Sequence, residues 1–421
     1  MIEPKLRFKA DDGSQFPDWE EKTFNDVADY KKGPFGSALK KEIFVPKSND
    51  TVKVYEQQNA ISKDWKLERY FVTNEYFQSK MKSFAVSGGD IIVSCAGTIG
   101  EMYELPHDAE EGIINQALMR VRIKKSVINS MIFRCVFDKM ISTEGVKISN
   151  GSALKNIPPF ADMKKQSVFV PSLPEQQKIA EFLSTIDTVI EKQKETVSAW
   201  EERKKGVMQK LFSQEVRFKA DDRSEFPEWE EKSYLSICNV FADGDWIESK
   251  DQSDSGIRLI QTGNIGNGVF IDKDDKKKYI SKETFDRLKC NEVFEGDILI
   301  SRLPSPAGRA CIVPKLNERM ITAVDCTIVR TDKSIILHDY CVQFMQSSKH
   351  FYYVASMMAG GTRQRISRKN LEDELISVPC LEEQQKIADC LSSLDEVIEK
   401  QKATLAAWEE LKKGLLQQMF V

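Results

Sequence analysis

The sequence predicts an α+β fold made by tandem duplication of one unit, a mixed strand-rich domain followed by a long helix. Three observations predict it: two sequence blocks each occur twice, two long stretches carry a heptad pattern of apolar residues, and short β-branched runs lie between them. The two long helices are expected to pair as an antiparallel coiled coil.

The repeated blocks set the predicted domain boundaries. The segment 7–22 recurs at 217–232 with an offset of 210, and the segment 175–180 recurs at 383–388 with an offset of 208. Offsets this similar indicate that the whole chain is duplicated. We therefore expect a first domain at 1–173, a central helix at 174–213, a second domain at 214–380 and a C-terminal helix at 381–421.

The interiors of the two domains differ. Residues 31–165 and 240–372 share only sparse landmarks, which indicates one scaffold that presents two different binding surfaces. One shared landmark is a Gly-Asp-Ile sequence, at 89–91 and 296–298, that leads into a short apolar run and a small-residue loop. Strands are expected at 51–55, 90–94, 118–123, 258–261, 297–301 and 326–330.

The two long helices carry the coiled-coil pattern. From Glu175 to Phe212 the only helix-weakening residue is Gly206, and Pro174 stands at the start, where proline is tolerated. Polar residues recur at matching seam positions, Lys204 with Lys412 among them, and can fix the register of the pairing. The residues expected to pair the helices are Ile179, Leu183, Ile186, Ile190, Gln193, Val197 and Trp200, with Ile387, Leu391, Leu394, Ile398, Gln401, Leu405 and Trp408.

Composition narrows the class of protein. The chain of 421 residues has 30% charged and 41% hydrophobic residues, which is typical of folded globular domains. No stretch approaches the roughly 20 apolar residues that span a bilayer, and the start lacks a signal-peptide pattern. The nine cysteines form no Cys-x-x-Cys pair, which suits free thiols in a reducing cytoplasm.

Several basic and polar segments are candidates for nucleic-acid contact. Arg reads guanine, Gln and Asn suit adenine, and Lys, Ser and Thr suit phosphate. A net charge of −4 does not exclude this binding, because binding depends on where the positive charges lie. The candidates are Lys31, Lys32, Lys40 and Lys41; Thr98; Lys147, Asn150, Ser152 and Lys155; Arg302 and Arg309; and Thr362, Arg363, Gln364, Arg365, Arg368 and Lys369. A solvated loop is the alternative for each segment.

Catalytic motifs are poorly matched. The stretch Asn156–Phe160 has an extra Ile within an Asn-Pro-Pro-Phe-like sequence, and no glycine-rich cofactor loop accompanies it. No phosphate-binding G-x-x-x-x-G-K-[ST] loop is present. The three histidines, His107, His338 and His350, lack metal-ligand spacing. We expect no catalytic residue and no metal site.

The pattern resembles the specificity subunit of Type I restriction–modification enzymes. The resemblance rests on the two Phe-Pro-x-Trp-Glu-Glu-Lys segments, the two Gly-Asp-Ile strands and the doubled Val-Pro-x-Leu-x-Glu-Gln-Gln-Lys-Ile-Ala at 170–180 and 378–388. It implies two target-recognition domains that read a split double-stranded DNA sequence, and helices that act as a spacer. It also implies partners: two modification subunits that bring S-adenosylmethionine and methylate adenine, and restriction subunits that bring ATP and Mg.

Two alternatives remain open from the residues alone. The chain could be a coiled-coil scaffold with two protein-binding domains and no affinity for DNA. It could also be a self-sufficient methyltransferase, in which case the chain alone would bind S-adenosylmethionine.

Overall fold

The computed structural model describes residues 4–148, 160–360 and 364–420, with backbone alone between 143 and 148. The described chain divides into two compact units, each formed by one strand-rich domain and parts of both long helices. Unit 1 comprises 1–192 and 406–421, and unit 2 comprises 193–405. Both divisions fall inside a long helix, whereas the predicted boundaries fall at the helix ends.

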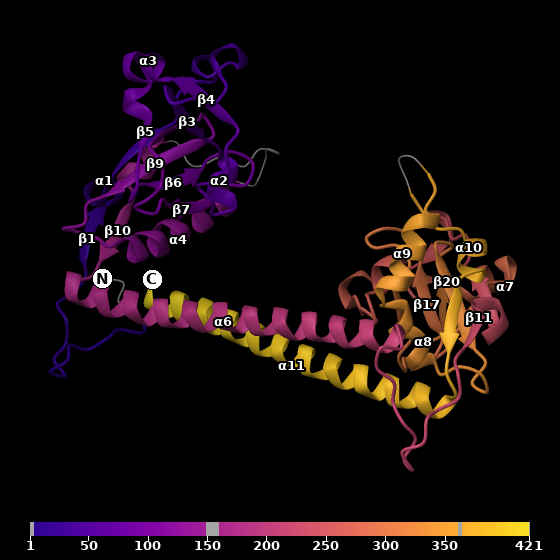
Figure 1. Cartoon of the computed structure of the whole chain (residues 1–421). Helices are drawn as coiled ribbons and strands as arrows, with labels where there is room; N and C mark the ends of the chain where they lie inside the picture. Colours follow the sequence, from indigo (N-terminus) through magenta and orange to yellow (C-terminus); the bar gives the residue numbers. More distant parts are fainter. Residues whose placement is uncertain (1–3, 149–159, 361–363, 421) are drawn as a thin grey trace. The chain divides into compact units, whose positions relative to one another are not determined.

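The elements of unit 1 form two four-stranded sheets and one two-stranded sheet (Figure 1). The strand orders are β2-β9-β6-β7, β4-β3-β8-β5 and β1-β10, with β3 and β8 parallel. The strands are β1 (Glu20–Thr23), β2 (Ala28–Lys32), β3 (Thr51–Tyr55), β4 (Tyr70–Thr73), β5 (Ala85–Val86), β6 (Ile91–Ser94), β7 (Met102–Glu104), β8 (Gly112–Ile114), β9 (Leu118–Ile123) and β10 (Ser167–Val170). The helices are α1 (Phe24–Val27), η1 (Gly36–Ala38), η2 (Lys41–Ile43), α2 (Gln57–Ile61), α3 (Asn74–Tyr76), η3 (Phe77–Met81), η4 (Lys82–Phe84), α4 (Ser130–Ile148), α5 (Phe160–Lys165) and the start of α6 (Leu173–Phe212).

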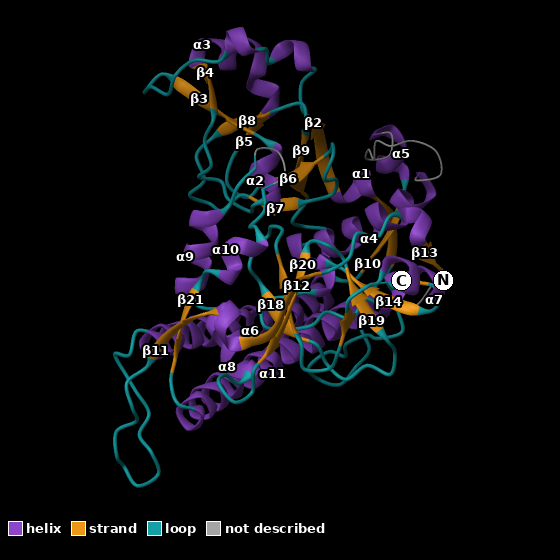
Figure 2. Ribbon diagram, turned by 90° about the vertical axis from the view of Figure 1, so that its right-hand side faces the viewer, coloured by secondary structure: helices purple, strands orange, loops and turns teal. Residues whose placement is uncertain are grey.

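Unit 2 repeats this plan with one more strand (Figure 2). Its sheets have the orders β12-β20-β17-β18, β13-β15-β14-β19-β16 and β11-β21. The strands are β11 (Glu230–Ser233), β12 (Cys238–Asp243), β13 (Gln252–Ser253), β14 (Ile257–Ile260), β15 (Tyr279–Ile280), β16 (Glu292–Val293), β17 (Ile298–Ser301), β18 (Ala310–Ile312), β19 (Met320–Thr322), β20 (Cys326–Thr331) and β21 (Leu375–Val378). The helices are the end of α6, η5 (Tyr234–Ile237), η6 (Ser249–Asp251), η7 (Thr262–Asn264), η8 (Asp274–Lys276), α7 (Lys282–Leu288), α8 (His338–Met345), α9 (Ser348–Met357), α10 (Arg368–Glu372) and the start of α11 (Leu381–Met419), whose end belongs to unit 1. The predicted α+β class and duplication are confirmed.

The repeated lead-in and the repeated helix motif contact each other in both units. In unit 1 the fully buried Glu175 carboxylate accepts two hydrogen bonds from Arg7, at 3.1 and 2.9 Å, and one from the Trp19 indole at 3.2 Å. In unit 2 the Glu383 carboxylate accepts the same three bonds from Arg217 and Trp229, at 3.1, 2.8 and 2.9 Å. A buried carboxylate needs such partners, because an unpaired buried charge is costly. These contacts explain why the two sequence blocks recur together.

The glutamine after each buried glutamate joins the helix to the rest of its domain. The Gln176 amide donates to the carbonyl oxygens of Val127 and Pro171 at 2.8 and 2.9 Å, and its oxygen accepts from the Asn129 backbone N–H at 2.8 Å. The Gln384 amide bonds in the same way to Ile335, Pro379 and Leu337. Each glutamine thus fixes the chain just before α4 or α8 against the start of a long helix.

The Gly-Asp-Ile landmark forms a turn closed by the aspartate. Gly89 and Gly296 have φ of +88° and +83°, a conformation that favours glycine. The Asp90 carboxylate accepts from the Ser87 backbone at 3.0 Å and pairs with Arg122 at 2.6 and 2.9 Å. In the second copy, Asp297 pairs with Arg330 at 2.8 Å through both oxygens. The aspartate therefore precedes the strand, so β6 and β17 begin one residue later than predicted.

The two long helices run antiparallel in both units. In unit 2 the Gln193 amide donates to the Gln401 side chain at 2.8 Å, and Lys204 pairs with Asp395 at 2.6 Å. In unit 1 Lys412 pairs with Asp187 at 2.5 Å, and these two residues are the repeat equivalents of Lys204 and Asp395. All fourteen residues predicted to pair the helices are buried or half-buried. The predicted antiparallel pairing is confirmed.

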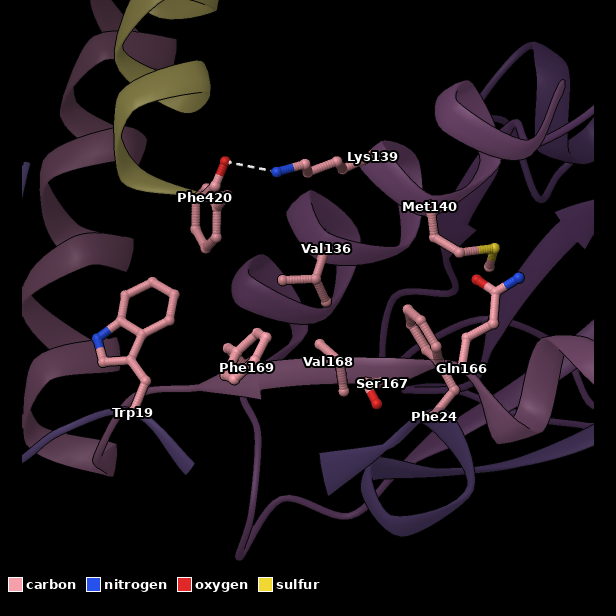
Figure 3. A pocket seen from close by; sticks show the side chains of 10 residues that line it. All are labelled: Trp19, Phe24, Val136, Lys139, Met140, Gln166, Ser167, Val168, Phe169 and Phe420. Carbon is pink, nitrogen blue, oxygen red and sulfur yellow. Dashed lines mark hydrogen bonds between the residues drawn. The ribbon is translucent and has the colours of Figure 1, made fainter. Parts of the chain in front are cut away.

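The ends of the helix pair also belong to the domain cores. Ile179 and Leu183 share one apolar cluster with strand residue Val168, and Ile387 and Leu391 share another with Tyr340. Near the chain end, the Phe420 ring packs 6.0 Å from the Trp19 ring, and the Lys139 ammonium donates to the Phe420 carbonyl at 2.9 Å (Figure 3). The first turns of each helix are therefore part of a domain core as well as of the coiled coil.

The Glu383→Gln substitution tests the buried carboxylate. The amide keeps the volume but removes the charge that holds the Arg217 guanidinium, so the free energy of unfolding should fall by about 3 kcal/mol. Urea unfolding of the full chain measures the change. Glu382→Gln is the matched control, because its side chain is 56% exposed and should change stability by less than about 0.5 kcal/mol. Equal effects of the two substitutions would contradict the assignment.

Candidate nucleic-acid interface

In unit 1 three connections meet at one edge of the β2-β9-β6-β7 sheet. The Gly33 N–H, after β2, donates to the Leu118 carbonyl at 2.8 Å, and the Cys95 N–H, after β6, donates to the Ala117 carbonyl at 2.8 Å. A Cβ on Gly33 would lie 1.8 Å from the Asn115 carbonyl oxygen, so only glycine fits. Main-chain hydrogen bonds thus join the connections after β2, after β6 and between β8 and β9 into one surface. We call this surface the stitched edge of unit 1.

Unit 2 has the same stitching with different side chains. The Gly244 N–H, after β12, donates to the Cys326 carbonyl at 2.8 Å, and the Arg302 N–H, after β17, donates to the Asp325 carbonyl at 2.9 Å. A Cβ on Gly244 would lie 2.4 Å from the carbonyl oxygens of Thr322 and Ala323. The two units therefore present equivalent loop edges, on which unmatched residues stand.

The predicted lysines of unit 1 lie on and beside this edge. Lys32, Lys40 and Lys41 are exposed, whereas the half-buried Lys31 places its ammonium 4.7 Å from the centre of the Phe84 ring. The buried Leu39 anchors the segment, and the Ala38 carbonyl accepts from the Tyr76 hydroxyl at 2.8 Å. Three lysines therefore extend into solvent from a fixed backbone.

The small-residue loop after β6 places Thr98 at the same edge. Thr98 is exposed, and its carbonyl accepts from the Gln57 amide at 3.2 Å. That amide also donates to the Ala96 carbonyl at 2.5 Å. Gln57 thus holds the loop from α2, and the Thr98 side chain remains accessible.

Arg302 and Arg309 face inward, in contrast to the expected contact with DNA. Arg302 is 5% exposed and donates to the Val324 carbonyl at 2.7 Å. The Arg309 guanidinium donates to four carbonyl oxygens, those of Ile265, Leu303, Pro306 and Thr262. Both guanidinium groups are used to hold loops together, so we assign them a positioning role. The sequence alone could not reveal whether these arginine side chains point into the protein or toward solvent.

In unit 2 the described residues on either side of 361–363 lie at the same edge. Ala359 and Arg365 exchange two backbone hydrogen bonds at 3.1 and 2.9 Å, and the Ile366 N–H donates to the Arg302 carbonyl at 3.2 Å. Arg365 lies 3.6 Å from the Asp325 carboxylate, and Gln364 is exposed. Gln364 and Arg365 therefore lie on the stitched edge.

The remaining predicted residues are Arg368 and Lys369 of α10 and six others that the structure describes in part or not at all. Arg368 and Lys369 pair with Glu372 and Asp373, four residues on along α10, at 2.9 and 2.8 Å. Lys147 lies in α4 with an undescribed side chain. Asn150, Ser152, Lys155, Thr362 and Arg363 lie outside the described residues.

The His, Cys, Asp and Glu side chains of the described residues do not gather into a metal site. Among residues 4–148, 160–360 and 364–420, no cluster of three or more His, Cys, Asp or Glu side chains could hold a metal ion. The nine cysteines are free thiols, and burial raises the pKa of Cys95 and of Cys326 to about 12, which keeps them protonated. Among the same residues, no helix has the length and apolar character to cross a bilayer.

Comparison with known proteins agrees with the duplication. The family model of the Type I restriction modification DNA specificity domain matches twice, at residues 17–198 and 227–407. The Type I restriction enzyme MjaVIII specificity subunit of Methanocaldococcus jannaschii is 22% identical, over 97% of this chain and 94% of the relative. The putative MjaX specificity subunit of the same organism is 25% identical, over 60% of this chain and 58% of the relative.

A solved structure shares the fold. Its description reads "Structural basis underlying complex assembly and conformational transition of the type I R-M system". It aligns with this chain with a TM-score of 0.56 at 16% identity. The alignment covers 96% of this chain and 98% of that chain. Because the family model covers both copies of the repeat, the chain belongs to the Type I restriction–modification DNA specificity family.

Proposed function

We propose that this chain reads a split double-stranded DNA target and directs partner subunits to it, without a catalytic site of its own. The observation that carries the proposal is the pair of equivalent loop edges, stitched by the same backbone bonds but lined by different side chains. One scaffold with two dissimilar surfaces suits a target made of two dissimilar halves.

Recognition would divide between phosphate and base contacts. Lys32, Lys40 and Lys41 project from a fixed segment of unit 1, where they can neutralise phosphates and set the register on the duplex. Thr98 in unit 1 and Gln364 in unit 2 are exposed on the stitched edges, and a glutamine amide pairs well with the adenine edge. Affinity would then come largely from the lysines and specificity from the loops.

Chemistry would reside on partner subunits. We infer that two modification subunits bring S-adenosylmethionine and methylate adenine, and that restriction subunits bring ATP and Mg. The target adenine must leave the base stack before it is methylated, because its amino group is inaccessible in the duplex. Such a complex would work in the cytoplasm, where the DNA is.

Two equivalent grooves suit two copies of the modification subunit. In unit 2 the groove lies between the end of α6 and the turn from α8 into the start of α9, and in unit 1 between the end of α11 and helix α4. The helix residues that line them correspond one to one between the copies, with the same charges and polarity: Glu201, Lys204, Lys205, Met208, Gln209 and Phe212 with Glu409, Lys412, Lys413, Leu416, Gln417 and Phe420. Matched grooves fit a partner that binds twice, whereas the loop edges differ.

Exchange of residues 240–372 for those of a family relative tests the proposal. Only one half of the methylated motif should change, because each domain reads its own half-site. Single-molecule sequencing of DNA from cells that express the complex gives the motif before and after the exchange. A change in both halves would contradict modular reading, and no sequence preference in the parent complex would favour the protein-scaffold alternative.

Neutralising the exposed lysines tests the proposed phosphate binding. The triple variant Lys32→Gln, Lys40→Gln, Lys41→Gln should weaken binding to specific and random duplexes by similar factors. The slope of log affinity against log salt should become shallower by about 0.9 for each phosphate that the variant no longer neutralises. A control variant, Lys276→Gln with Lys278→Gln, removes two exposed charges elsewhere and should leave the slope unchanged. An unchanged slope in the triple variant would remove these lysines from the interface.

A bulky residue in each groove tests partner binding. Gln209 and Gln417 are exposed and equivalent, so Gln209→Trp should block one modification subunit and Gln417→Trp the other. Native mass spectrometry should then find one modification subunit bound instead of two, and none in the double variant. Gln385→Trp, on an exposed part of α11 outside the groove, should retain two. Retention of two partners by the double variant would exclude the grooves.

A further inference from the structure

Two large aromatic side chains are left exposed at the same place in both copies. Phe35 is 89% exposed and Trp246 is 69% exposed. Single exposed apolar residues are common on proteins, so exposure alone carries no argument. Here Phe35 follows Gly33 by two positions, and Trp246 follows Gly244 by two positions. The N–H of each glycine donates to a carbonyl at the start of β9 or β20, at 2.8 Å in both units. The alignment of the two stitched glycines makes Phe35 and Trp246 structural equivalents.

The backbone on both sides of each aromatic residue is fixed. Before and after Phe35, Pro34 and Leu39 are buried, and the Phe35 carbonyl accepts from the Ala38 N–H at 2.8 Å as η1 begins. Before Trp246, the Asp245 N–H donates to the Thr322 carbonyl at 2.8 Å. After it, Ile247 packs against an apolar cluster of unit 2. Each ring is therefore held out to solvent by an anchored turn, which lowers the entropic cost of binding through it.

The surroundings favour nucleic acid over protein as the partner. Lys32, Lys40 and Lys41 are exposed within six residues of Phe35, and Arg365 and Gln364 lie on the edge that carries Trp246. Of the carboxylates near Trp246, Glu248 accepts from the Trp246 indole at 3.4 Å and pairs with Lys250 at 2.8 Å, and Asp251 pairs with Arg287 at 2.6 Å. The Asp245 carboxylate instead accepts from the Asn291 backbone N–H at 2.9 Å. The two rings also differ and lie in unmatched sequence, unlike the matched grooves that suit one partner bound twice. Dissimilar tips suit dissimilar half-sites.

We propose that Phe35 and Trp246 are apolar wedges, each of which packs its ring against the bases of one half of the DNA target. Aromatic rings stack on unpaired or partly unstacked bases, and inserted apolar side chains loosen a base step. This inference rests on the proposed function, because the two rings add one base-contacting residue to each loop edge. A loosened step near the target adenine would lower the energy that the modification subunit needs to extrude it.

The test uses the full complex with modification subunits and a duplex that bears the methylated motif mapped in cells. Phe35→Ala and Trp246→Ala should each weaken specific binding about 10- to 100-fold. Each should relax base discrimination in only one half of the motif. The salt slope should stay unchanged, because both substitutions leave the charge as it is. Phe35→Trp and Trp246→Phe should restore most of the affinity. Leu235→Ala, which shortens another exposed apolar residue (55% exposed), should bind as the parent does.

The outcomes separate the two proposals. Parent complex that shows no preference for the motif duplex would overturn both the proposed function and the wedges. A parent complex with normal preference, and alanine variants that match it, would overturn the wedges alone. Loss of modification subunits from the alanine variants, seen by native mass spectrometry, would also overturn them and assign the rings to protein contact.

Discussion

The structure depends on one buried ion pair that occurs twice. Glu175 and Glu383 are fully buried at the starts of the long helices, and each binds an arginine and a tryptophan from a lead-in segment more than 150 residues earlier. Such a carboxylate is stable only when its partners are in place, so the helix start, the lead-in and the domain between them must come together. The neighbouring Gln176 and Gln384 extend this constraint to the loops before α4 and α8. The interior of each domain can vary because its two ends are closed in this way.

Assembly and recognition therefore depend on different residues. The matched contacts, among them Asp187 with Lys412 and Lys204 with Asp395, hold each helix against the other through charge and polar complementarity. The unmatched residues gather on the loop edges, where Thr98, Gln364 and the exposed lysines stand. A subunit that must keep constant partners and variable targets needs this division, and the duplication provides it on a single chain.

Much of the fold could be predicted from the sequence because its signals are local or repeated. β3 and β9 have the predicted bounds, and the helix starts were predicted to within one residue from Pro174 and the repeated motif. Strands of two residues, such as β5 and β16, are too short to leave a pattern. The directions of Arg302 and Arg309 could not be predicted, because a positive charge in a loop does not reveal whether it meets solvent or a carbonyl oxygen. The equivalence of Gly33 and Gly244 was hidden because their offset of 211 differs from those of the repeated blocks.

The stitching of the loop edges by main-chain bonds has an evolutionary consequence. Backbone donors and carbonyls do not depend on the identity of the side chains at the loop tips, apart from the two glycines that permit the close approach. The side chains that also hold the loops, those of Gln57, Arg302 and Arg309, bond to main-chain carbonyls. Substitutions at the loop tips can therefore accumulate at little cost in folding. New targets would then arise through a few residue changes in these turns, as well as through wholesale replacement of a domain, and lineages could diverge in what they recognise while retaining interchangeable partners.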